Sequence, residues 1–304
     1  MKVFIDGKAG TTGLELETRL KKRSDINLLE IDPSLRKDPN ARKEMINKSD
    51  VTFLCLPDEE ARVSAQMANE NIIVIDASTA HRTAIGWTYG LPELSSRHRE
   101  NMKSAKRIAV PGCHASGFIA LVYPLVSEGL IDKNANLNCT SLTGYSGGGK
   151  GMIADYETNR TPNDKLKAPR PYALTLTHKH LPEMQTVCGL TTAPNFMPVV
   201  GDIKQGMLVS VPIWNKNKEE VWETLFNHYK NSHFIKVMDI DYPLDNGFLD
   251  PTACNNTNNM ELFVFGNNTH LQLVARHDNL GKGASGAAVQ CMNIACGIDE
   301  KKGL

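Results

Sequence analysis

The sequence lacks an excess of charge of either sign. Its 304 residues carry 34 Lys and Arg against 34 Asp and Glu. A net charge near zero creates no overall field that favours nucleic acid or a membrane surface. We therefore expect neither as a partner, and any anionic ligand must be held by local groups.

The sequence also lacks long apolar runs, internal repeats and low-complexity tracts. No stretch reaches the apolar length of a membrane-spanning helix, and the first residues run directly into a strand-like segment without a basic leader. These absences favour a folded protein in the cytoplasm. At roughly 100 to 200 residues per domain, the length predicts about two domains.

Paired cysteine motifs are absent as well. The seven cysteines are odd in number and show no C-x-x-C spacing, which argues against a disulfide framework or a zinc site. Reduced thiols are the simplest interpretation, and most of them can be small buried hydrophobes. They stand at positions 55, 113, 139, 188, 254, 291 and 296.

In the first part of the chain, strand-like and helix-like segments alternate. The run VFID precedes the glycine loop GKAGTTG and the amphipathic segment LELETRLKKR. Further strands are predicted at INLLEI, VTFLCL and IIVIDAS, with helices around residues 40–48 and 59–70. Such alternation predicts an α/β fold with a doubly wound parallel sheet over residues 1–112.

The pattern changes from residue 113 onward. FIALVYPLV is helix-like, LNCTSLTGYS and MLVSVPIW are strand-like, and the glycine run 147–151 interrupts them. NNMELFVFGNN and HLQLVARHD predict antiparallel strands. Residues 113–281 therefore form a second, α+β domain, and 282–304 return to a helical pattern.

The glycine loop is a candidate phosphate site. Gly7, Gly10 and Gly13 lie between a strand and a helix, where a phosphate can approach a backbone without β-carbons and meet free amides. Thr11 and Thr12 add hydroxyl donors. Tight turns also use glycine for steric reasons alone, but the placement at the first strand favours a dinucleotide.

Residues after the second strand bear on which dinucleotide binds. Asp32 stands near the position where an acidic side chain binds the ribose of NAD. Arg36 and Lys37 follow, and a guanidinium there suits the 2′-phosphate of NADP. The residues by themselves leave both cofactors open.

Cys113, in VPGCHASGF, is the candidate nucleophile. It precedes an apolar helix expected over residues 117–126, and a helix N-terminus stabilises a thiolate. The same amides suit the oxyanion of a carbonyl under attack. The alternative is a packed thiol beside a Pro-Gly turn.

Two histidines in LTHKHLPEM are candidates for proton transfer. His178 and His180 share one side of an extended segment, and Glu183 is placed to orient either ring. We assign His180 to acid/base work and His178 to a substrate contact. The H-x-H pattern is also half a metal site, but no third ligand at a supporting spacing is evident, so we predict no metal. His114 projects differently from its neighbour at a helix start and is not expected to be the base.

Taken together, these segments resemble the shorter form of the N-acetyl-gamma-glutamyl-phosphate reductases of arginine biosynthesis. The resemblance extends over nearly the whole chain, and the order and spacing of its motifs are specific. The motifs are DGKAGTTGLEL, CLPDEEA, DASTAHR, GWTYGLPEL, VPGC, GYSGGGKGMI, LTHKHLPEM and GKGASGAAVQ.

The resemblance implies a Rossmann domain that binds NADP and an inserted catalytic domain of the glyceraldehyde-3-phosphate dehydrogenase type, with a C-terminal helix that packs back on the first domain. It implies NADPH-dependent reduction of N-acetyl-L-glutamyl 5-phosphate to the 5-semialdehyde, through a thioester on Cys113, by a homo-oligomer, dimer or tetramer. It assigns the acyl-phosphate substrate to Ser78, Arg82, Ser146 and Gly147, and a nicotinamide contact to Gly283.

Two positions depart from the family pattern. His114 and Ser116 stand where the family usually has an aromatic residue and a threonine. Alternatives remain: an aspartate-semialdehyde dehydrogenase, which acts on a shorter substrate; a thiol hydrolase, which leaves the glycine loop unused; and a cofactor-binding regulator with an unreactive Cys113. Without the resemblance, an ion pair between Arg82 and Asp76 is as plausible as a phosphate site.

Overall fold

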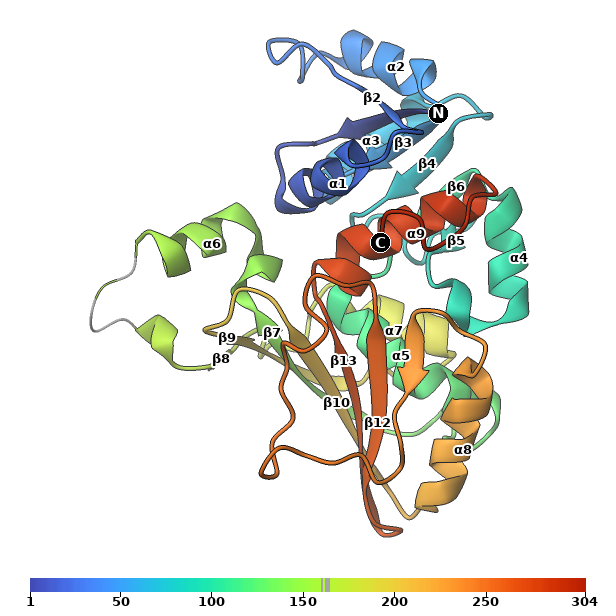
Figure 1. Ribbon diagram of the computed structural model, residues 1–304, viewed down its shortest axis with the longest axis vertical. Coiled ribbons are helices and arrows are strands. Elements are labelled where there is room, and N and C mark those ends of the chain that lie inside the picture. The colour runs from blue at the N-terminus through green and yellow to red at the C-terminus, as the bar shows by residue number, and fades with distance from the viewer. Residues whose placement is uncertain (160, 162–164) are drawn as a thin grey trace. The chain divides into compact units, whose positions relative to one another are not determined.

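The computed structural model describes residues 1–159, 161 and 165–304, and they form two compact units (Figure 1). Unit 1 contains residues 1–112 together with 284–304, and unit 2 contains residues 113–283. The chain thus leaves unit 1 immediately before Cys113 and returns to it after Gly283.

Unit 1 is a doubly wound α/β fold, as the alternating segments predict. Its strands pair in parallel in the order β2-β1-β3-β4-β6-β5. In chain order its elements are β1 (Lys2–Asp6), α1 (Thr11–Lys21), β2 (Asn27–Leu29), α2 (Pro39–Lys48), β3 (Val51–Leu54), α3 (Asp58–Met67), β4 (Ile73–Asp76), β5 (Thr88–Tyr89), η1 (Pro92–Leu94), α4 (Ser96–Ser104), β6 (Arg107–Ala109) and α9 (Gly286–Ala295).

Both faces of this sheet are covered, because alternate side chains of its strands enter different cores. Phe53 and Ile75 pack with α1, α4 and α9 on one face. Leu54 and Val74 pack with α3 on the other. The C-terminal helix α9 is therefore part of the core of unit 1.

Unit 2 is built on a mixed sheet in the order β11-β12-β13-β10-β7-β9-β8. The strands predicted at LNCTSLTGYS and MLVSVPIW are confirmed as β7 and β10, and the predicted antiparallel pair is confirmed as β12 and β13. Its elements are α5 (Cys113–Ser127), β7 (Asn138–Gly144), η2 (Tyr145–Gly148), α6 (Gly149–Glu157), η3 (Lys165–Lys167), β8 (Arg170–Pro171), α7 (Leu181–Cys188), β9 (Asn195–Gly201), β10 (Met207–Trp214), α8 (Lys218–Tyr229), β11 (Ile235–Val237), β12 (Met260–Gly266), β13 (His270–His277) and the π-helical turn η4 (Gly281–Ser285), which runs into unit 1.

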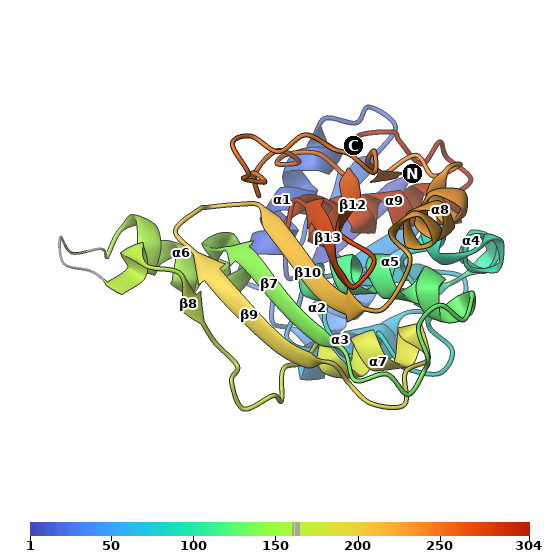
Figure 2. The same ribbon diagram turned by 90° about the horizontal axis from the view of Figure 1, so that it is seen from below.

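Helix α5 lies on the sheet of unit 2 beside α7 and α8 (Figure 2). A β-carbon at Gly117 would stand 2.6 Å from Cγ2 of Val209 and 3.1 Å from the ring of His277, so a glycine lets the helix approach β10 and β13. The Tyr229 hydroxyl of α8 donates to the carbonyl of Ala120 at 2.9 Å.

Two local expectations differ from the structure. Helix α5 begins at Cys113, four residues before the apolar run suggested, because the small residues after the cysteine also fit a buried helix face. The glycine run 147–151 does not simply interrupt the chain, since η2 ends at Gly148 and α6 begins at Gly149.

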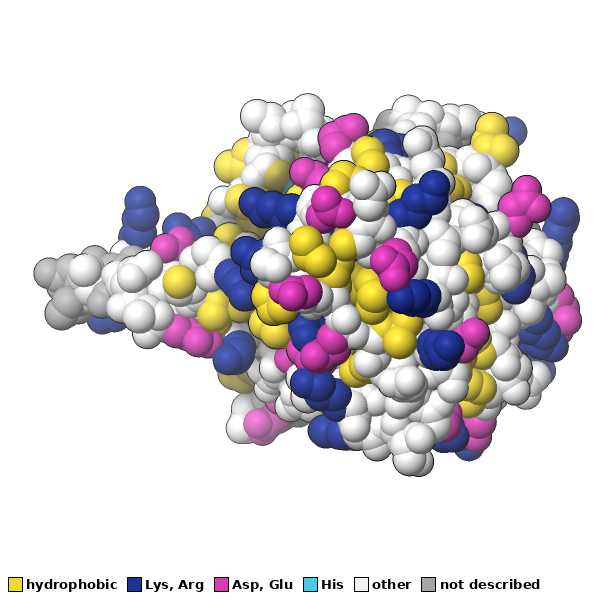
Figure 3. Space-filling model, turned by 90° about the horizontal axis from the view of Figure 1, so that it is seen from above, with side chains coloured by type: hydrophobic (Ala, Val, Ile, Leu, Met, Phe, Trp, Pro, Cys, Tyr) yellow, Lys and Arg dark blue, Asp and Glu magenta, His cyan; other side chains and the backbone are white. Residues whose placement is uncertain are grey.

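The surface carries both charges. On the face that Figure 3 shows, Lys and Arg side chains alternate with Asp and Glu side chains. Within the described residues no helix has the length and apolarity needed to cross a bilayer.

The fit of α5 on the sheet predicts the effect of a single methyl group. Replacing Gly117 with Ala should lower the free energy of unfolding by about 1–2 kcal/mol, because the overpacking exceeds the gain in helix propensity. Gly151 is a matched control in α6, where an added β-carbon meets nothing within 4 Å. Gly151→Ala should be neutral or slightly stabilising in urea unfolding. Equal effects of the two substitutions would contradict this packing account.

Candidate active site

Cys113 is the first residue of α5 and is half-buried. A β-carbon at Gly283 would come within 2.8 Å of the β-carbon of Cys113, so glycine is needed where η4 passes the cysteine. His277 Nε2 lies 3.0 Å from the carbonyl oxygen of Cys113. Because a carbonyl only accepts, this nitrogen carries the proton and donates. The backbone of Cys113 is therefore held from two sides.

The other thiols differ from Cys113 in their setting. Burial raises the pKa of five of them, which keeps them protonated: Cys55, Cys139, Cys188, Cys254 and Cys296. Cys291 is fully buried. Cys113 is thus the half-buried thiol that stands at the N-terminus of a long helix, where a thiolate is stabilised.

His178 and His180 lie side by side, as the H-x-H spacing predicts. Their ring centroids are 4.8 Å apart, and His180 caps the N-terminus of α7. The backbone N–H of His180 donates to Nδ1 of His178 at 3.2 Å. Glu183 is buried in the first turn of α7, and its assigned role in orienting a ring stays a prediction.

His114 joins this pair, although its position in the sequence does not indicate it. Its ring centroid is 5.7 Å from that of His178 and 5.4 Å from that of His180. The sequence shows no third ligand at a supporting spacing, but the fold brings one beside the pair, because α5 supplies His114 from 64 residues away along the chain. No local spacing could have revealed it.

His114 is held at both ring nitrogens. Nδ1 lies 2.7 Å from the hydroxyl oxygen of Ser141, and Nε2 lies 3.0 Å from that of Tyr172. Burial first, and then neighbouring positive groups, lower the pKa of His114 to about 3. Burial and the nearby charge of Cys113 raise the pKa of the Tyr172 phenol. Tyr172 thus links the cysteine to the histidine group.

The predicted substrate loop follows β7. Ser146 is buried in η2, and its hydroxyl oxygen accepts from the Asn279 side-chain amide at 2.9 Å. Asn279 also accepts from the backbone N–H of Gly206 at 3.0 Å. A β-carbon at Gly147 would make only ordinary contacts. The loop is therefore positioned by residues just after β13.

The three glycines of the loop in unit 1 differ in whether a β-carbon would fit. A β-carbon at Gly7 or Gly13 would come within 2.3 Å or 2.7 Å of a backbone oxygen, so the turn itself requires these glycines. At Gly10 an added β-carbon would come no closer than 3.5 Å. Thr11 follows at the start of α1, and its buried hydroxyl oxygen has no hydrogen-bond partner among the described residues. An open glycine and an unsatisfied hydroxyl at a helix N-terminus fit a phosphate.

Asp32, the acidic candidate after the second strand, is already hydrogen-bonded within its own turn. Asp32 accepts from the backbone N–H and hydroxyl of Ser34 at 2.8 Å and 2.7 Å, and these bonds lower its pKa. Arg36 is exposed and forms no hydrogen bond or ion pair within the described part of the chain. Thr12 lies in the first turn of α1.

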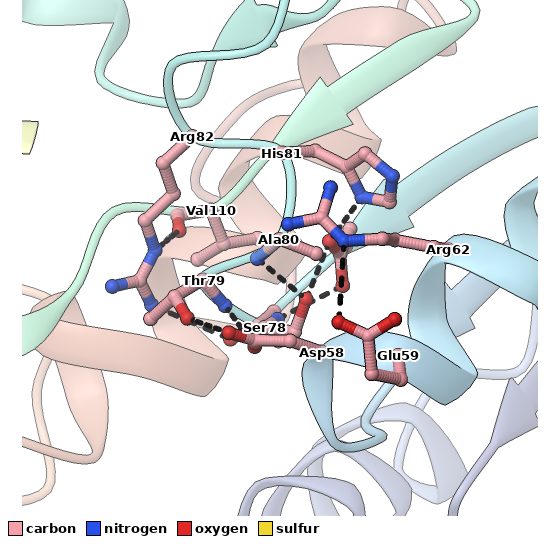
Figure 4. Close-up of polar contacts among 11 residues, drawn as sticks. Asp58, Glu59, Arg62, Ser78, Thr79, Ala80, His81, Arg82 and Val110 are labelled. Atoms are coloured by element: carbon pink, nitrogen blue, oxygen red, sulfur yellow. Dashed lines mark hydrogen bonds and ion pairs between the residues drawn. The ribbon is translucent and has the colours of Figure 1, made fainter. Parts of the chain in front are cut away.

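Arg82 and Ser78 occupy a tightly bonded loop after β4 (Figure 4). Buried Asp76 accepts from the Ser78 hydroxyl at 2.7 Å and lies 2.6 Å from Nδ1 of His81. Arg82 donates to the carbonyl oxygens of Val110 at 3.0 Å and Ala77 at 3.4 Å. Asp76 is thus satisfied by its loop neighbours, and the guanidinium is held by carbonyls.

A network missed by the sequence analysis lies at the end of β1. Buried Asp6 binds the Arg42 guanidinium at 2.8 Å and accepts from the Ser64 hydroxyl at 2.7 Å. The signal was a lone acidic residue directly before the glycine loop. It connects β1 with α2 and α3 and thereby fixes the strand that leads into Gly7.

Family models match both units. Residues 29–104 match the model described as the semialdehyde dehydrogenase NAD binding domain, and residues 113–279 match the semialdehyde dehydrogenase dimerisation domain.

Solved structures agree on the fold. The chain is similar to aspartate semialdehyde dehydrogenase from Francisella tularensis, with a TM-score of 0.72 at 14% identity over 97% of this chain and 99% of that one. It is similar to the Candida albicans enzyme with NADP, with a TM-score of 0.67 at 16% identity over 96% and 97%. The fold and the family models define an oxidoreductase of the semialdehyde dehydrogenase class.

Sequence relatives identify the branch. The chain is 43% identical to N-acetyl-gamma-glutamyl-phosphate reductase 2 of Nostoc sp., over 100% of this chain and 99% of that protein. It is 44% identical to N-acetyl-gamma-glutamyl-phosphate reductase of Chelativorans sp., over 96% and 97%. The chain belongs to the N-acetyl-gamma-glutamyl-phosphate reductase family. The resemblance read from the motifs is confirmed.

The buried His277 predicts a pH dependence of stability. Burial lowers its pKa to about 4, while the bond to the Cys113 carbonyl and the charge of Asp278 raise it and Lys282 lowers it. In the unfolded chain a histidine has a pKa near 6.5. Between these two pH values the unfolded state binds more protons than the folded state. The contribution of His277 to the free energy of unfolding is therefore fully present above about pH 6.5 and is lost as the pH falls toward 4.

Replacing His277 with Gln, which keeps a donor for the carbonyl, should reduce the loss of unfolding free energy between pH 6.5 and 5 by up to about 2 kcal/mol. The exposed His233 provides the control, and His233→Gln should leave the pH slope unchanged. If the free energy of unfolding of His277→Gln depends on pH as it does in wild type, the folded and unfolded pKa values of His277 do not differ as proposed.

Proposed function

We propose that the chain catalyses NADPH-dependent reduction of N-acetyl-L-glutamyl 5-phosphate to N-acetyl-L-glutamate 5-semialdehyde, with release of phosphate. The observation that carries the proposal is the half-buried Cys113 at the start of α5, beside a group of histidines and the half-buried Tyr172. Relatives more than 40% identical over nearly their whole length are reductases of this substrate by name.

The cofactor residues of the proposal lie in unit 1. Gly7, Gly10, Thr11, Thr12 and Gly13 would hold the pyrophosphate at the start of α1, as the open position at Gly10 and the unsatisfied Thr11 hydroxyl support. When bound, NADPH supplies the hydride that reduces the thioester carbon. Gly283, which closely approaches Cys113, is the candidate neighbour of the nicotinamide.

Arg36 is the proposed determinant for NADP. Its exposed guanidinium suits a 2′-phosphate, and Asp32 is engaged in a turn with Ser34 instead of being presented to a ribose. Glu30, the other acidic residue there, is bonded to Lys8 at 3.2 Å. A free carboxylate would repel the negatively charged 2′-phosphate, and these contacts reduce that repulsion.

Covalent chemistry is assigned to Cys113. The thiolate attacks the acyl carbon, the tetrahedral oxyanion forms near the first amides of α5, and phosphate leaves as the thioester forms. After reduction the carbon–sulfur bond breaks and the aldehyde is released. The thiolate is regenerated, so the sulfur ends the cycle as it began.

Proton transfer is assigned to His180, with His178 as a substrate contact. His180 takes the proton of the Cys113 thiol and so generates the thiolate that attacks. It gives this proton to the oxygen of the reduced tetrahedral adduct and takes it back as the adduct collapses to the aldehyde. Its place at the N-terminus of α7, within 4.8 Å of the His178 centroid, supports a shared site.

Substrate oxygens are assigned to Arg82, Ser78, Ser146 and Gly147. A planar guanidinium binds an acyl phosphate well, and Arg82 is held by the carbonyl of Val110. Val110 stands three residues before Cys113, so the chain between their Cα atoms spans at most about 11 Å. Ser146 is fixed by Asn279 and supports binding of the N-acetylglutamyl part.

Removing the sulfur tests the reaction. Cys113→Ser should lower kcat for N-acetylglutamyl phosphate by on the order of 10³-fold or more. Binding of NADPH, followed by its fluorescence, should persist. Cys296→Ser, at another half-buried thiol, is the matched control and should retain activity. The proposal fails if Cys113→Ser turns over normally, or if wild type reduces aspartyl phosphate faster than N-acetylglutamyl phosphate.

A second substitution tests the cofactor assignment. Arg36→Ala should raise KM for NADPH by about 10- to 100-fold, because a charge-assisted bond to the 2′-phosphate is lost, and should change KM for NADH little. Arg97→Ala, at an exposed arginine of α4, serves as the control. Equal changes for both nucleotides would remove Arg36 from this role.

We also propose that the protein is a homo-oligomer, a dimer or tetramer, that uses the sheet face opposite α5. Leu208 of β10 is half-buried and pairs with Leu142 of β7, which pairs in turn with Val199 of β9. Their neighbour Met197 is 41% exposed. An apolar sheet face of this kind suits a second copy of the same face.

Leu208→Glu should shift the protein to a smaller species in sedimentation velocity, since a charge would be buried at the contact. Leu244→Glu, at an exposed leucine in a loop, should leave the distribution unchanged. A monomeric wild type, or an unchanged Leu208→Glu, would argue against this interface.

The proposed location is the cytoplasm. All seven cysteines are free, which suits a reducing compartment. Recovery of the protein outside the cytoplasmic fraction of its native cells would overturn this assignment.

A further inference from the structure

We propose that His114, His178 and His180 form a binding site for a divalent transition-metal ion, with Zn²⁺ as the best fit, and that the bound ion inhibits the enzyme. Within the part of the chain that the structure describes, this is the one group of three histidine, cysteine or acidic side chains with metal-site spacing. The metal site stands independently of the reaction, whereas inhibition rests on the proposed function of His180.

The three rings converge from two separate segments. One ligand nitrogen from each lies within 4.8 Å of the others. Zinc binds imidazole nitrogen at about 2.0–2.1 Å, so tetrahedral ligands stand about 3.3 Å apart. His178 is half-buried, while His114 and His180 are buried, so a modest inward movement of the more exposed ring closes the site.

The surroundings support ligation at His114. Its Nδ1 lies 2.7 Å from the buried Ser141 hydroxyl, which orients the ring as supporting partners of metal-bound histidines do. Its Nε2 lies 3.0 Å from the Tyr172 hydroxyl and exchanges that contact for the metal. Three histidines leave a fourth position for water.

The chemistry of the donors selects the ion. Imidazole nitrogens suit Zn²⁺, Cu²⁺ and Ni²⁺, whereas Mg²⁺ and Ca²⁺ require oxygen ligands. The three metal-binding positions are all histidines, and Phe196 packs its ring against two of them, with centroids 5.3 Å from His114 and 5.1 Å from His178. The apolar ring of Phe196 beside the nitrogen ligands limits the access of water, which favours tight binding of an ion such as Zn²⁺.

A bound ion would occupy the lone pair that His180 needs for proton transfer. Zinc should therefore inhibit reduction of N-acetylglutamyl phosphate reversibly, and a chelator should restore activity. Mg²⁺ at the same concentration should have no effect, because the three ligands are imidazole nitrogens and Mg²⁺ prefers oxygen.

The test measures binding directly. Full-length protein is titrated with Zn²⁺ against a chromophoric chelator, in a buffer free of phosphate, and a stoichiometry of one is expected. His114→Phe removes one ligand, and His114→Gln retains a polar group in case the first variant fails to fold. Each should weaken zinc binding by at least on the order of 100-fold, the upper end of the loss caused by removing a supporting partner. His233→Phe, at an exposed histidine elsewhere in unit 2, should bind as wild type does.

The outcomes separate the two claims. Absence of stoichiometric binding by wild type, or equal affinity in the folded His114 variants, overturns the site. Binding without any change in reductase activity overturns inhibition and leaves the site standing. If Zn²⁺ binds but wild type shows no reductase activity at all, the proposed reaction has failed and the metal site has not.

Discussion

The approach of helix α5 to the sheet of unit 2 is the contact on which the site depends. Two glycines make it possible, Gly117 against Val209 and Gly283 against Cys113. His277 adds a bond to the Cys113 carbonyl at 3.0 Å. Because the helix is held at its first turn and at its middle, its N-terminal amides and the sulfur keep a fixed relation. A larger side chain at either glycine would displace the cysteine.

This contact also organises the histidines. With Cys113 fixed, the next residue, His114, lies in a group with His180, which is buried, and His178, which is half-buried. Ser141 and Tyr172 bond the two ring nitrogens of His114. The helix terminus favours a thiolate at Cys113, while burial raises the pKa of five other thiols. The same convergence brings three histidine rings to metal-site spacing. In the account proposed here, proton transfer and zinc binding therefore use the same side chains.

Much of the fold could be predicted from the sequence, because its signals are local. Short apolar segments that alternate with helix-like segments predict the parallel sheet of unit 1. Segments rich in β-forming residues and bounded by Asn and Gly predict β12 and β13. The short strand β5 and the helix α6 that begins within a glycine run carry no such signal. At the site, the 178–180 pair was readable from its spacing, but His114 was not, since its neighbours are brought together only by the tertiary fold.

The central claim is that one sulfur of seven is held as a reactive thiolate. Its most direct measurement is the alkylation rate of every cysteine by iodoacetamide at pH 7, resolved by peptide mass spectrometry in the folded protein. Cys113 should react at least about tenfold faster than the half-buried Cys55 and Cys296. If Cys113 reacts no faster than these two thiols, the helix terminus does not activate it and the account is wrong.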